Sequence, residues 1–213
     1  MTDFSRENPS ERYDELVTKY EKIHNKGKGY FNGKSLLKYI TNVHQKIIVH
    51  ECKSLLDYGS GKGLLYTEEC DMVVPLVNKG KGISRPLQEL WNLTHHQCYD
   101  PAYPEHSKKP EGKFDAVISI DVLEHIHEPD LEWVLNEIFS YSEKMVFLNV
   151  ACFKAAKHFE DGENVHISVF NPEWWFILVS DIMKNYPGIT TYLLCEKVCL
   201  LYTSDAADEE DSV

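Results

Sequence analysis

The chain has 213 residues, of which 22 are basic and 34 acidic, and its formal net charge is −12. This length suits one domain with a sizeable core and leaves too few residues for a second. The negative charge, with no local basic cluster, argues against a nucleic-acid partner.

The sequence predicts a cytoplasmic location. No segment reaches the ~18 consecutive apolar residues of a membrane span, and the polar N-terminus lacks the apolar stretch of an export signal. The six cysteines, at positions 52, 70, 98, 152, 195 and 199, form no C-x-x-C pair and no zinc spacing with histidine. Several lie in apolar runs, so we expect buried, reduced thiols.

Two helices are predicted before the first strand, within residues 10–50. Apolar side chains recur at helical spacing between Ser10 and His24, and Ser10 can cap this helix. A loop rich in glycine and lysine follows at residues 25–33. Ser35 can cap a second helix that ends near His50.

A glycine loop follows the predicted first strand, in the segment Leu55-Leu56-Asp57-Tyr58-Gly59-Ser60-Gly61-Lys62-Gly63. The apolar pair predicts the end of a buried parallel strand. The alternating glycines allow a sharp turn and the close approach of a ligand. We expect a helix to begin near Leu64, with its first amides facing that ligand.

Spacing separates three ligand classes for this loop. A phosphate-binding P-loop needs Gly, four residues, then Gly-Lys-Ser/Thr, but Leu56 stands at the first glycine position and Gly63 at the hydroxyl position. A dinucleotide fingerprint needs its third glycine at Leu64, which weakens that alternative and leaves it open. The arrangement resembles the first motif of class I S-adenosylmethionine-dependent methyltransferases, with Asp57 at the acidic position.

The next strand is predicted at residues 95–99 and ends at Asp100, before Pro101. An acid at the end of the second strand of a doubly wound sheet can accept hydrogen bonds from ribose hydroxyls, although an Asp-Pro turn is the alternative. Only 13 residues separate Asp100 from Phe114. We therefore expect the usual third strand to be short or missing.

The segment Phe114 to Ile126 is a near-continuous apolar run, which predicts a strand buried on both faces. It resembles the "FD.V...DVLEH" signature of small-molecule methyltransferases. That resemblance implies that Asp121, Val122 and Leu123 line the methionine end of the cofactor, and that His125 faces it or caps the next helix. Glu124, His125 and His127 are residue types that bind metals, but the sequence shows no well-spaced ligand set that would complete a site with them. We therefore expect no metal site.

Further elements complete a prediction of an α/β fold, a Rossmann-like doubly wound sheet of mostly parallel strands. Helices are predicted at residues 131–141 and from Pro172 onward, and strands at 145–150 and 189–198. In the helix after Pro172, the predicted buried side comprises Trp174, Trp175, Ile177, Leu178 and Ile182. Residues 1–198 should form one domain. Residues 199–213 should be a disordered tail, or an artefact like the adapter translations found in metagenomic reading frames.

Similarity to a bacterial and phage-associated group of class I methyltransferases extends over residues 12 to 200. It includes Tyr30 to Leu36, Lys144 to Cys152, Asp161 to His166, and Asn171 to Trp175. The resemblance implies transfer of a methyl group from S-adenosylmethionine, with S-adenosylhomocysteine as product. It also implies N-terminal helices that act as a lid, although helices that only cover one face of the sheet are an equal alternative. We expect a small-molecule acceptor, no nucleic-acid or membrane partner, and a monomer or homodimer.

This resemblance and the loop chemistry assign a set of cofactor-binding residues: Asp57, Tyr58, Gly59, Ser60, Gly61, Gly63, Asp100, Asp121, Val122, Leu123 and His125. His166 is the candidate general base, because it follows a strand on the side where open α/β sheets bind ligands; a structural histidine is the alternative. Tyr30, Asn149 and Trp174 are candidate substrate contacts. A cofactor-binding protein without turnover, or a dinucleotide-dependent oxidoreductase, remains an alternative function.

Overall fold

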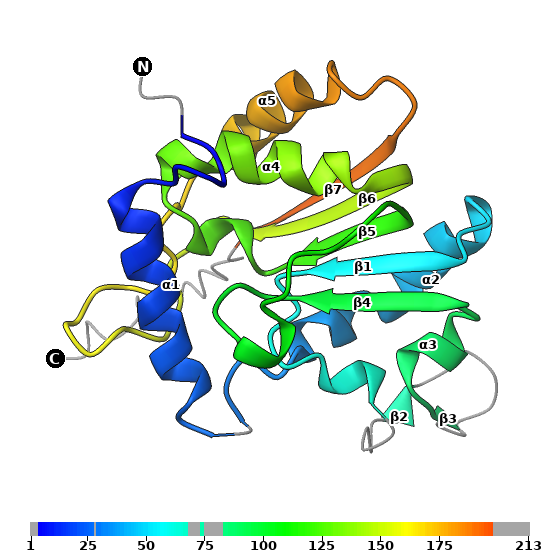
Figure 1. Cartoon of the computed structure of the whole chain (residues 1–213), viewed down its shortest axis with the longest axis horizontal. Coiled ribbons are helices and arrows are strands. Elements are labelled where there is room, and N and C mark those ends of the chain that lie inside the picture. Colours follow the sequence, from blue (N-terminus) through cyan, green and yellow to red (C-terminus); the bar gives the residue numbers. More distant parts are fainter. Residues whose placement is uncertain (1–3, 28, 68–72, 75–82, 198–213) are drawn as a thin grey trace, which may run out of the picture.

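The computed structural model describes residues 4–27, 29–67, 73–74 and 83–197. A five-stranded sheet forms its centre, in the order β4-β1-β5-β6-β7, and every neighbouring pair is parallel (Figure 1). The strands are β1 Ser54–Tyr58, β4 His95–Tyr99, β5 Phe114–Ile120, β6 Ser142–Ala151 and β7 Thr190–Glu196. The predicted Rossmann-like α/β fold is confirmed. Within the described residues β4 is an edge strand, as expected if the third strand is missing.

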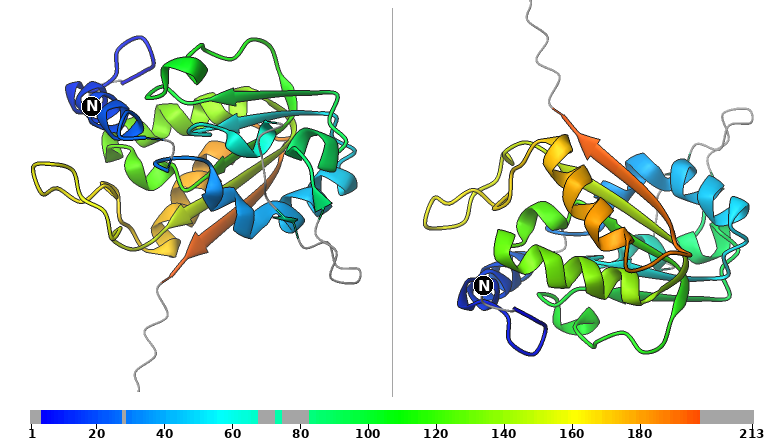
Figure 2. Two further views of the ribbon diagram at one scale, coloured as in Figure 1. Left: turned by 90° about the horizontal axis from the view of Figure 1, so that it is seen from below. Right: turned by 90° about the horizontal axis from the view of Figure 1, so that it is seen from above.

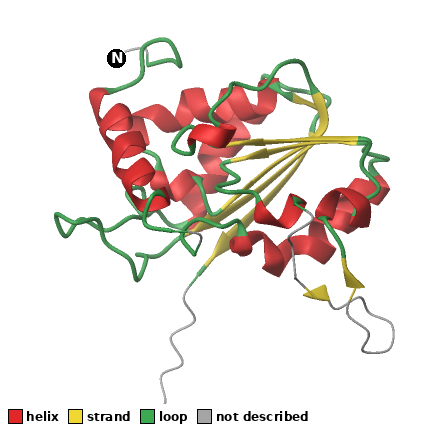
Figure 3. Cartoon of the chain, turned by 60° about the horizontal axis from the view of Figure 1, so that its bottom comes forward, coloured by secondary structure: helices red, strands yellow, loops and turns green. Residues whose placement is uncertain are grey.

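The central strands are apolar because both faces of the sheet are covered. Helices α4 Leu131–Ser140 and α5 Pro172–Met183 cover one face. The other carries the 3₁₀ helix η1 Lys34–Tyr39, with α2 Ile40–Val49 and α3 Leu87–Leu90. Figure 3 shows these helices on the two sides of the twisted sheet, and the small hairpin of β2 Val73–Val74 and β3 Ile83–Ser84 apart from it.

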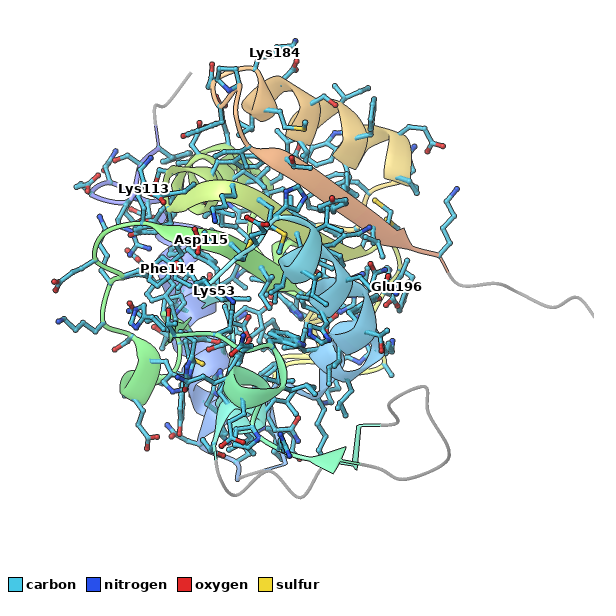
Figure 4. All side chains as sticks on the ribbon, turned by 90° about the vertical axis from the view of Figure 1, so that its right-hand side faces the viewer. Lys53, Lys113, Phe114, Asp115, Lys184 and Glu196 are labelled. Carbon is cyan, nitrogen blue, oxygen red and sulfur yellow. The ribbon has the colours of Figure 1, made fainter. Side chains whose placement is uncertain are left out.

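The amino ends of β1 and β5 are joined by one carboxylate. Asp115 accepts hydrogen bonds from the backbone amides of Lys53 at 2.6 Å and Ser54 at 3.1 Å, and its side chain lies 3.0 Å from Lys144 Nζ. Figure 4 shows Lys53, Phe114 and Asp115 close together at this end of the sheet. This contact holds β1 and β5 in register at their amino ends. The register in turn sets how the carboxyl ends of the two strands are aligned.

Helix α1, Glu11–His24, lies across the carboxyl ends of the strands, where the arrowheads of β1 and β4 point (Figure 1). Its N-cap is Ser10, as predicted, whose side chain accepts a hydrogen bond from the Tyr13 amide. The fully buried Asp130 accepts a hydrogen bond from the Ser10 amide at 3.0 Å and another from the Ser10 hydroxyl. These bonds hold α1 against the end of the sheet.

Three local predictions were wrong. Gly33, with a φ of 82°, stands at the start of the second helical segment, and Ser35 does not cap it. After the glycine loop only a 3₁₀ turn forms, η2 Leu64–Tyr66, before the described residues break off. Ile177 on α5 is 61% exposed, because the buried positions 175, 179 and 182 lie on the opposite face of the helix.

Two other predictions concern the C-terminal tail and membrane spans. The tail predicted at residues 199–213 lies outside the described residues. Among the helices in the described ranges, none has the length and apolar content needed to cross a membrane.

Candidate functional site

The carboxyl ends of β1, β4 and β5 meet beneath α1, and a cavity of about 100 Å³ lies between them. We call it the first cavity. Six residues predicted to bind the cofactor line it: Tyr58, Gly59, Asp100, Asp121, Val122 and His125. Residues on α1 that the sequence did not assign to the site also line it: Tyr13, Leu16, Val17, Tyr20 and His24. The sequence left open whether this helix is a lid over a ligand or only covers the sheet, and it singled out none of these five side chains as a site residue.

The glycine loop is closed by hydrogen bonds within the protein. The amides of Gly59 and Ser60 donate to the carbonyl of Tyr99, at 2.7 and 3.1 Å. Further along, the Lys62 amide donates to Phe31 O at 2.8 Å. These three amides are therefore taken by backbone carbonyls in this conformation. Our expectation that the first amides after Leu64 face a ligand stays a prediction.

Each loop glycine is required by its neighbours and its backbone. Gly59, Gly61 and Gly63 all have positive φ, between 55° and 82°. A Cβ would lie 2.3 Å from a Val122 methyl carbon at Gly59, and 2.3 Å from Phe31 O at Gly61. The three glycines thus allow protein segments to pack against the loop.

Four predicted cofactor residues besides Gly63 do not line the first cavity: Asp57, Ser60, Gly61 and Leu123. Leu123 is fully buried in the core. Burial raises the pKa of Asp57 to about 7. These residues support the loop and the strand ends, so any contact with a cofactor stays a prediction.

Asp100 fastens the glycine loop to the end of β4. Its Oδ2 accepts a hydrogen bond from the Gly61 amide and its Oδ1 from the Ala102 amide, both at 2.9 Å. Burial raises the pKa of this carboxyl, and the two amide bonds oppose that rise. Each carboxylate oxygen can accept a second bond, so the carboxylate can still take hydroxyl donors from a ligand.

His24 gives the site a pH dependence. Burial lowers its pKa from 6.5 to about 4, with help from the positive charges of Lys62 and His106. The unfolded chain therefore takes up a proton that the folded chain does not. Keeping His24 uncharged in the folded protein therefore makes the free energy of unfolding depend on pH. The stability associated with it is fully present above pH 6.5 and is lost as the pH falls toward 4.

We expect the substitution His24→Phe to reduce the loss of unfolding free energy between pH 6.5 and 4.5. Phenylalanine can keep the stacking on Tyr103, whose ring centroid lies 5.2 Å away, and cannot bind a proton. Part of the loss should remain, because burial also lowers the pKa of His125 to about 4. Urea unfolding at several pH values gives the slope of the unfolding free energy against pH for the wild type and for the variant. Identical slopes in the two proteins would contradict this assignment.

A second cavity, of about 360 Å³, lies beside the first. The two share Phe31, Asp121 and His125 in their walls. Asn149, a predicted substrate contact, and His166, the predicted base, line the second cavity. The loop after β6 that carries His166 lies at the same end of the molecule as α1 (Figure 2).

The other two predicted substrate contacts line neither cavity. Tyr30 is 38% exposed, with Lys157 Nζ 5.4 Å from its ring centroid. Trp174 stacks on Phe170 at the start of α5, with ring centroids 3.8 Å apart. Tyr30 therefore lies next to Phe31 and Lys157 at the rim of the second cavity, whereas Trp174 packs on α5.

Asp121 stands where the two cavities meet. Its φ of 60° is unusual for a residue with a side chain, and its Oδ2 accepts a hydrogen bond from Ser35 Oγ at 2.7 Å. The amides of Ile167 and Ser168 donate to Glu124 O at 2.8 and 2.9 Å, which brings the loop after β6 to this point.

An all-parallel sheet with a glycine loop after its first strand, and cavities at the carboxyl ends of its strands, defines the class of Rossmann-like α/β proteins that bind ligands at this edge. A family model described as a methyltransferase domain matches residues 6–189, so the chain belongs to the methyltransferase domain family. Searches of curated proteins and of solved structures gave no significant match. The family match confirms the resemblance to class I methyltransferases and does not favour a dinucleotide-dependent oxidoreductase.

Proposed function

We propose that this protein is a cytoplasmic enzyme that transfers the methyl group of S-adenosylmethionine to a small molecule. One observation carries the proposal. Asp100 and Asp121, predicted to bind the cofactor, line one cavity, while Asn149 and His166, predicted to act on the acceptor, line another that shares a wall with it. Donor and acceptor bound in these cavities would be neighbours.

The first cavity must enlarge to take the cofactor. Its volume of about 100 Å³ is below the ~300–1,000 Å³ of typical ligand sites. Phe31, whose carbonyl contacts the glycine loop, and α1 form its outer wall. We infer that residues 29–33 and α1 move outward when the cofactor binds, which is the lid role predicted for the N-terminal helices.

The residues of the first cavity suit the two ends of S-adenosylmethionine. Asp100 has acceptor capacity for the ribose hydroxyls beyond its two amide bonds. The carboxylate of Asp121 would lie toward the positively charged amino and sulfonium groups. The sulfonium supplies the leaving group, so the protein chiefly holds donor and acceptor in line.

The second cavity suits a small polar acceptor. Its walls carry both charges, from Lys38, Lys157 and Glu196 among others. His166 would act as general base if the acceptor must lose a proton in the reaction. A macromolecular acceptor is less consistent with a cavity of about 360 Å³ and a net charge of −12.

Transfer of a labelled methyl group tests the proposal. The purified chain is incubated with methyl-tritiated S-adenosylmethionine and a cell extract separated by size into small-molecule, protein and nucleic-acid fractions. We expect tritium in the small-molecule fraction, and none when the Asp100→Ala variant replaces the wild type. Label confined to protein or nucleic acid would contradict the small-molecule acceptor.

A further inference from the structure

Three side chains that commonly bind metal ions converge between the two cavities. One ligating atom from each of Asp121, His125 and His166 lies within 4.8 Å of the other two, and all three residues line the second cavity. Around a shared ion, with bonds near 2.1 Å, ligand atoms lie about 3–3.5 Å apart. Side-chain movements on the order of 1 Å would therefore close this set around one ion.

Both imidazole rings are held with Nε2 free to bind a cation. His125 Nδ1 lies 2.8 Å from Val165 O, and His166 Nδ1 lies 2.6 Å from Phe153 O. Because a carbonyl oxygen only accepts hydrogen bonds, these contacts assign a proton to each Nδ1, and the Tyr20 hydroxyl, 3.1 Å from His125 Nδ1, donates instead to Val165 O. An uncharged ring in this tautomer has its lone pair on Nε2. Metal-binding histidines are commonly oriented by such a bond to a backbone carbonyl.

A buried carboxylate oxygen next to this set is also without a partner. Glu124 is 0% exposed, and its Oε1 accepts a hydrogen bond from the Ala151 amide at 2.7 Å. Its Oε2 has no hydrogen-bond partner in the part of the chain that the structure describes. Glu124 immediately precedes His125 in the chain, and its carboxyl lies close enough to that of Asp121 for two negative charges there to repel each other. A cation held by Asp121 would offset the cost of burying this oxygen.

We propose that Asp121, His125 and His166 bind one divalent transition-metal ion. The buried carboxyl of Glu124 lies next to these ligands and does not bind the ion itself. Two imidazoles and one carboxylate favour zinc, iron, cobalt or nickel, whereas magnesium and calcium prefer sites made of oxygen ligands. Three protein ligands leave coordination positions for another molecule. His166 is then a metal ligand and not a general base, and the Asp121 carboxylate holds the ion instead of facing the positive groups of the cofactor.

The position of the ion also indicates the acceptor class, a step that rests on the proposed function. The ligand set faces the second cavity, where the acceptor would bind. An acceptor with a hydroxyl or carboxylate oxygen could take an open coordination position, and the ion would then hold it beside the methyl donor. The metal site itself stands on the three side chains and needs no cofactor.

Titration with cobalt(II) tests the metal site directly. The purified full chain is treated with EDTA, desalted, and titrated with CoCl₂ in the absence of S-adenosylmethionine. We expect visible ligand-field absorption that saturates at one cobalt ion per chain, and that ZnCl₂ abolishes while equimolar MgCl₂ does not. The variants Asp121→Asn and His166→Ala, on different elements, should each weaken cobalt binding at least ~10-fold.

The control is His158→Ala, an exposed histidine in the same loop as His166, which should leave cobalt binding unchanged. Circular dichroism verifies that each variant is folded, and Asp121→Asn keeps an oxygen for the hydrogen bond from Ser35. No absorption in the wild type, or equal absorption in the wild type and both variants, would overturn the metal site. Cobalt binding without S-adenosylmethionine binding would instead contradict only the proposed function.

Discussion

The substitution Gly61→Ala should destabilise the protein more than an alanine at any glycine in open space. A Cβ at position 61 would lie 2.3 Å from Phe31 O and 3.0 Å from the Phe31 carbonyl carbon, and both atoms belong to the backbone. Either the glycine loop or residues 29–33 must then move, and the bond from the Lys62 amide to Phe31 O is lost. Such overpacking costs about 1–3 kcal/mol in addition to the strain of a positive φ.

Gly112→Ala is the matched control for this prediction. Gly112 also has a positive φ, of 80°, but a Cβ there meets nothing within 4 Å. The difference between the two variants in the free energy of unfolding, measured by urea denaturation, therefore isolates the collision with Phe31. We also expect Gly61→Ala to bind no S-adenosylmethionine, because the added Cβ would project into the space that Phe31 must leave for the cofactor. Equal losses of stability in the two variants would show that the loop and residues 29–33 do not pack as described.

The substitution Asp100→Ala should lower both stability and cofactor affinity. It leaves the buried amides of Gly61 and Ala102 without their acceptor. Each of the two unsatisfied donors costs about 1–3 kcal/mol, so the free energy of unfolding should fall by about 2–6 kcal/mol. Affinity for S-adenosylmethionine should fall at least ~10-fold, since the ribose also loses its acceptor.

Two further variants test the cause of this effect. Asp100→Asn keeps one acceptor oxygen and should recover part of the stability. Asp181→Ala removes a 61% exposed carboxylate that pairs with Lys184 on the surface, and should change stability by less than about 0.5 kcal/mol. If Asp100→Ala were as stable as Asp181→Ala, Asp100 would not be holding the loop.

The strands and the position of the site could be predicted because local patterns determine them. The apolar run from Phe114 could only be buried on both faces, and the structure places it as β5 in the middle of the sheet. The carboxyl ends of parallel strands all lie on the same side of a sheet, so Asp100 and Asp121 had to lie near each other once both strands were recognised. The structure confirms that both line the first cavity.

Contacts between distant segments could not be predicted from local patterns. Nothing in the sequence around Gly61 indicates that its neighbour is Phe31 O, because that contact depends on how residues 29–33 fold back. The apolar stripe of α1 is the same whether it covers a core or a ligand, so the sequence did not assign Tyr20 to the site. His166 meets His125 only because the loop after β6 binds to Glu124 O, and this is why the sequence predicted no metal.

Isothermal titration calorimetry of the purified chain with S-adenosylmethionine, S-adenosylhomocysteine and NAD tests the central claim most directly. We predict that the two sulfur compounds each bind at one site per chain and that NAD does not bind. Binding of NAD, together with no heat from either sulfur compound, would contradict the claim.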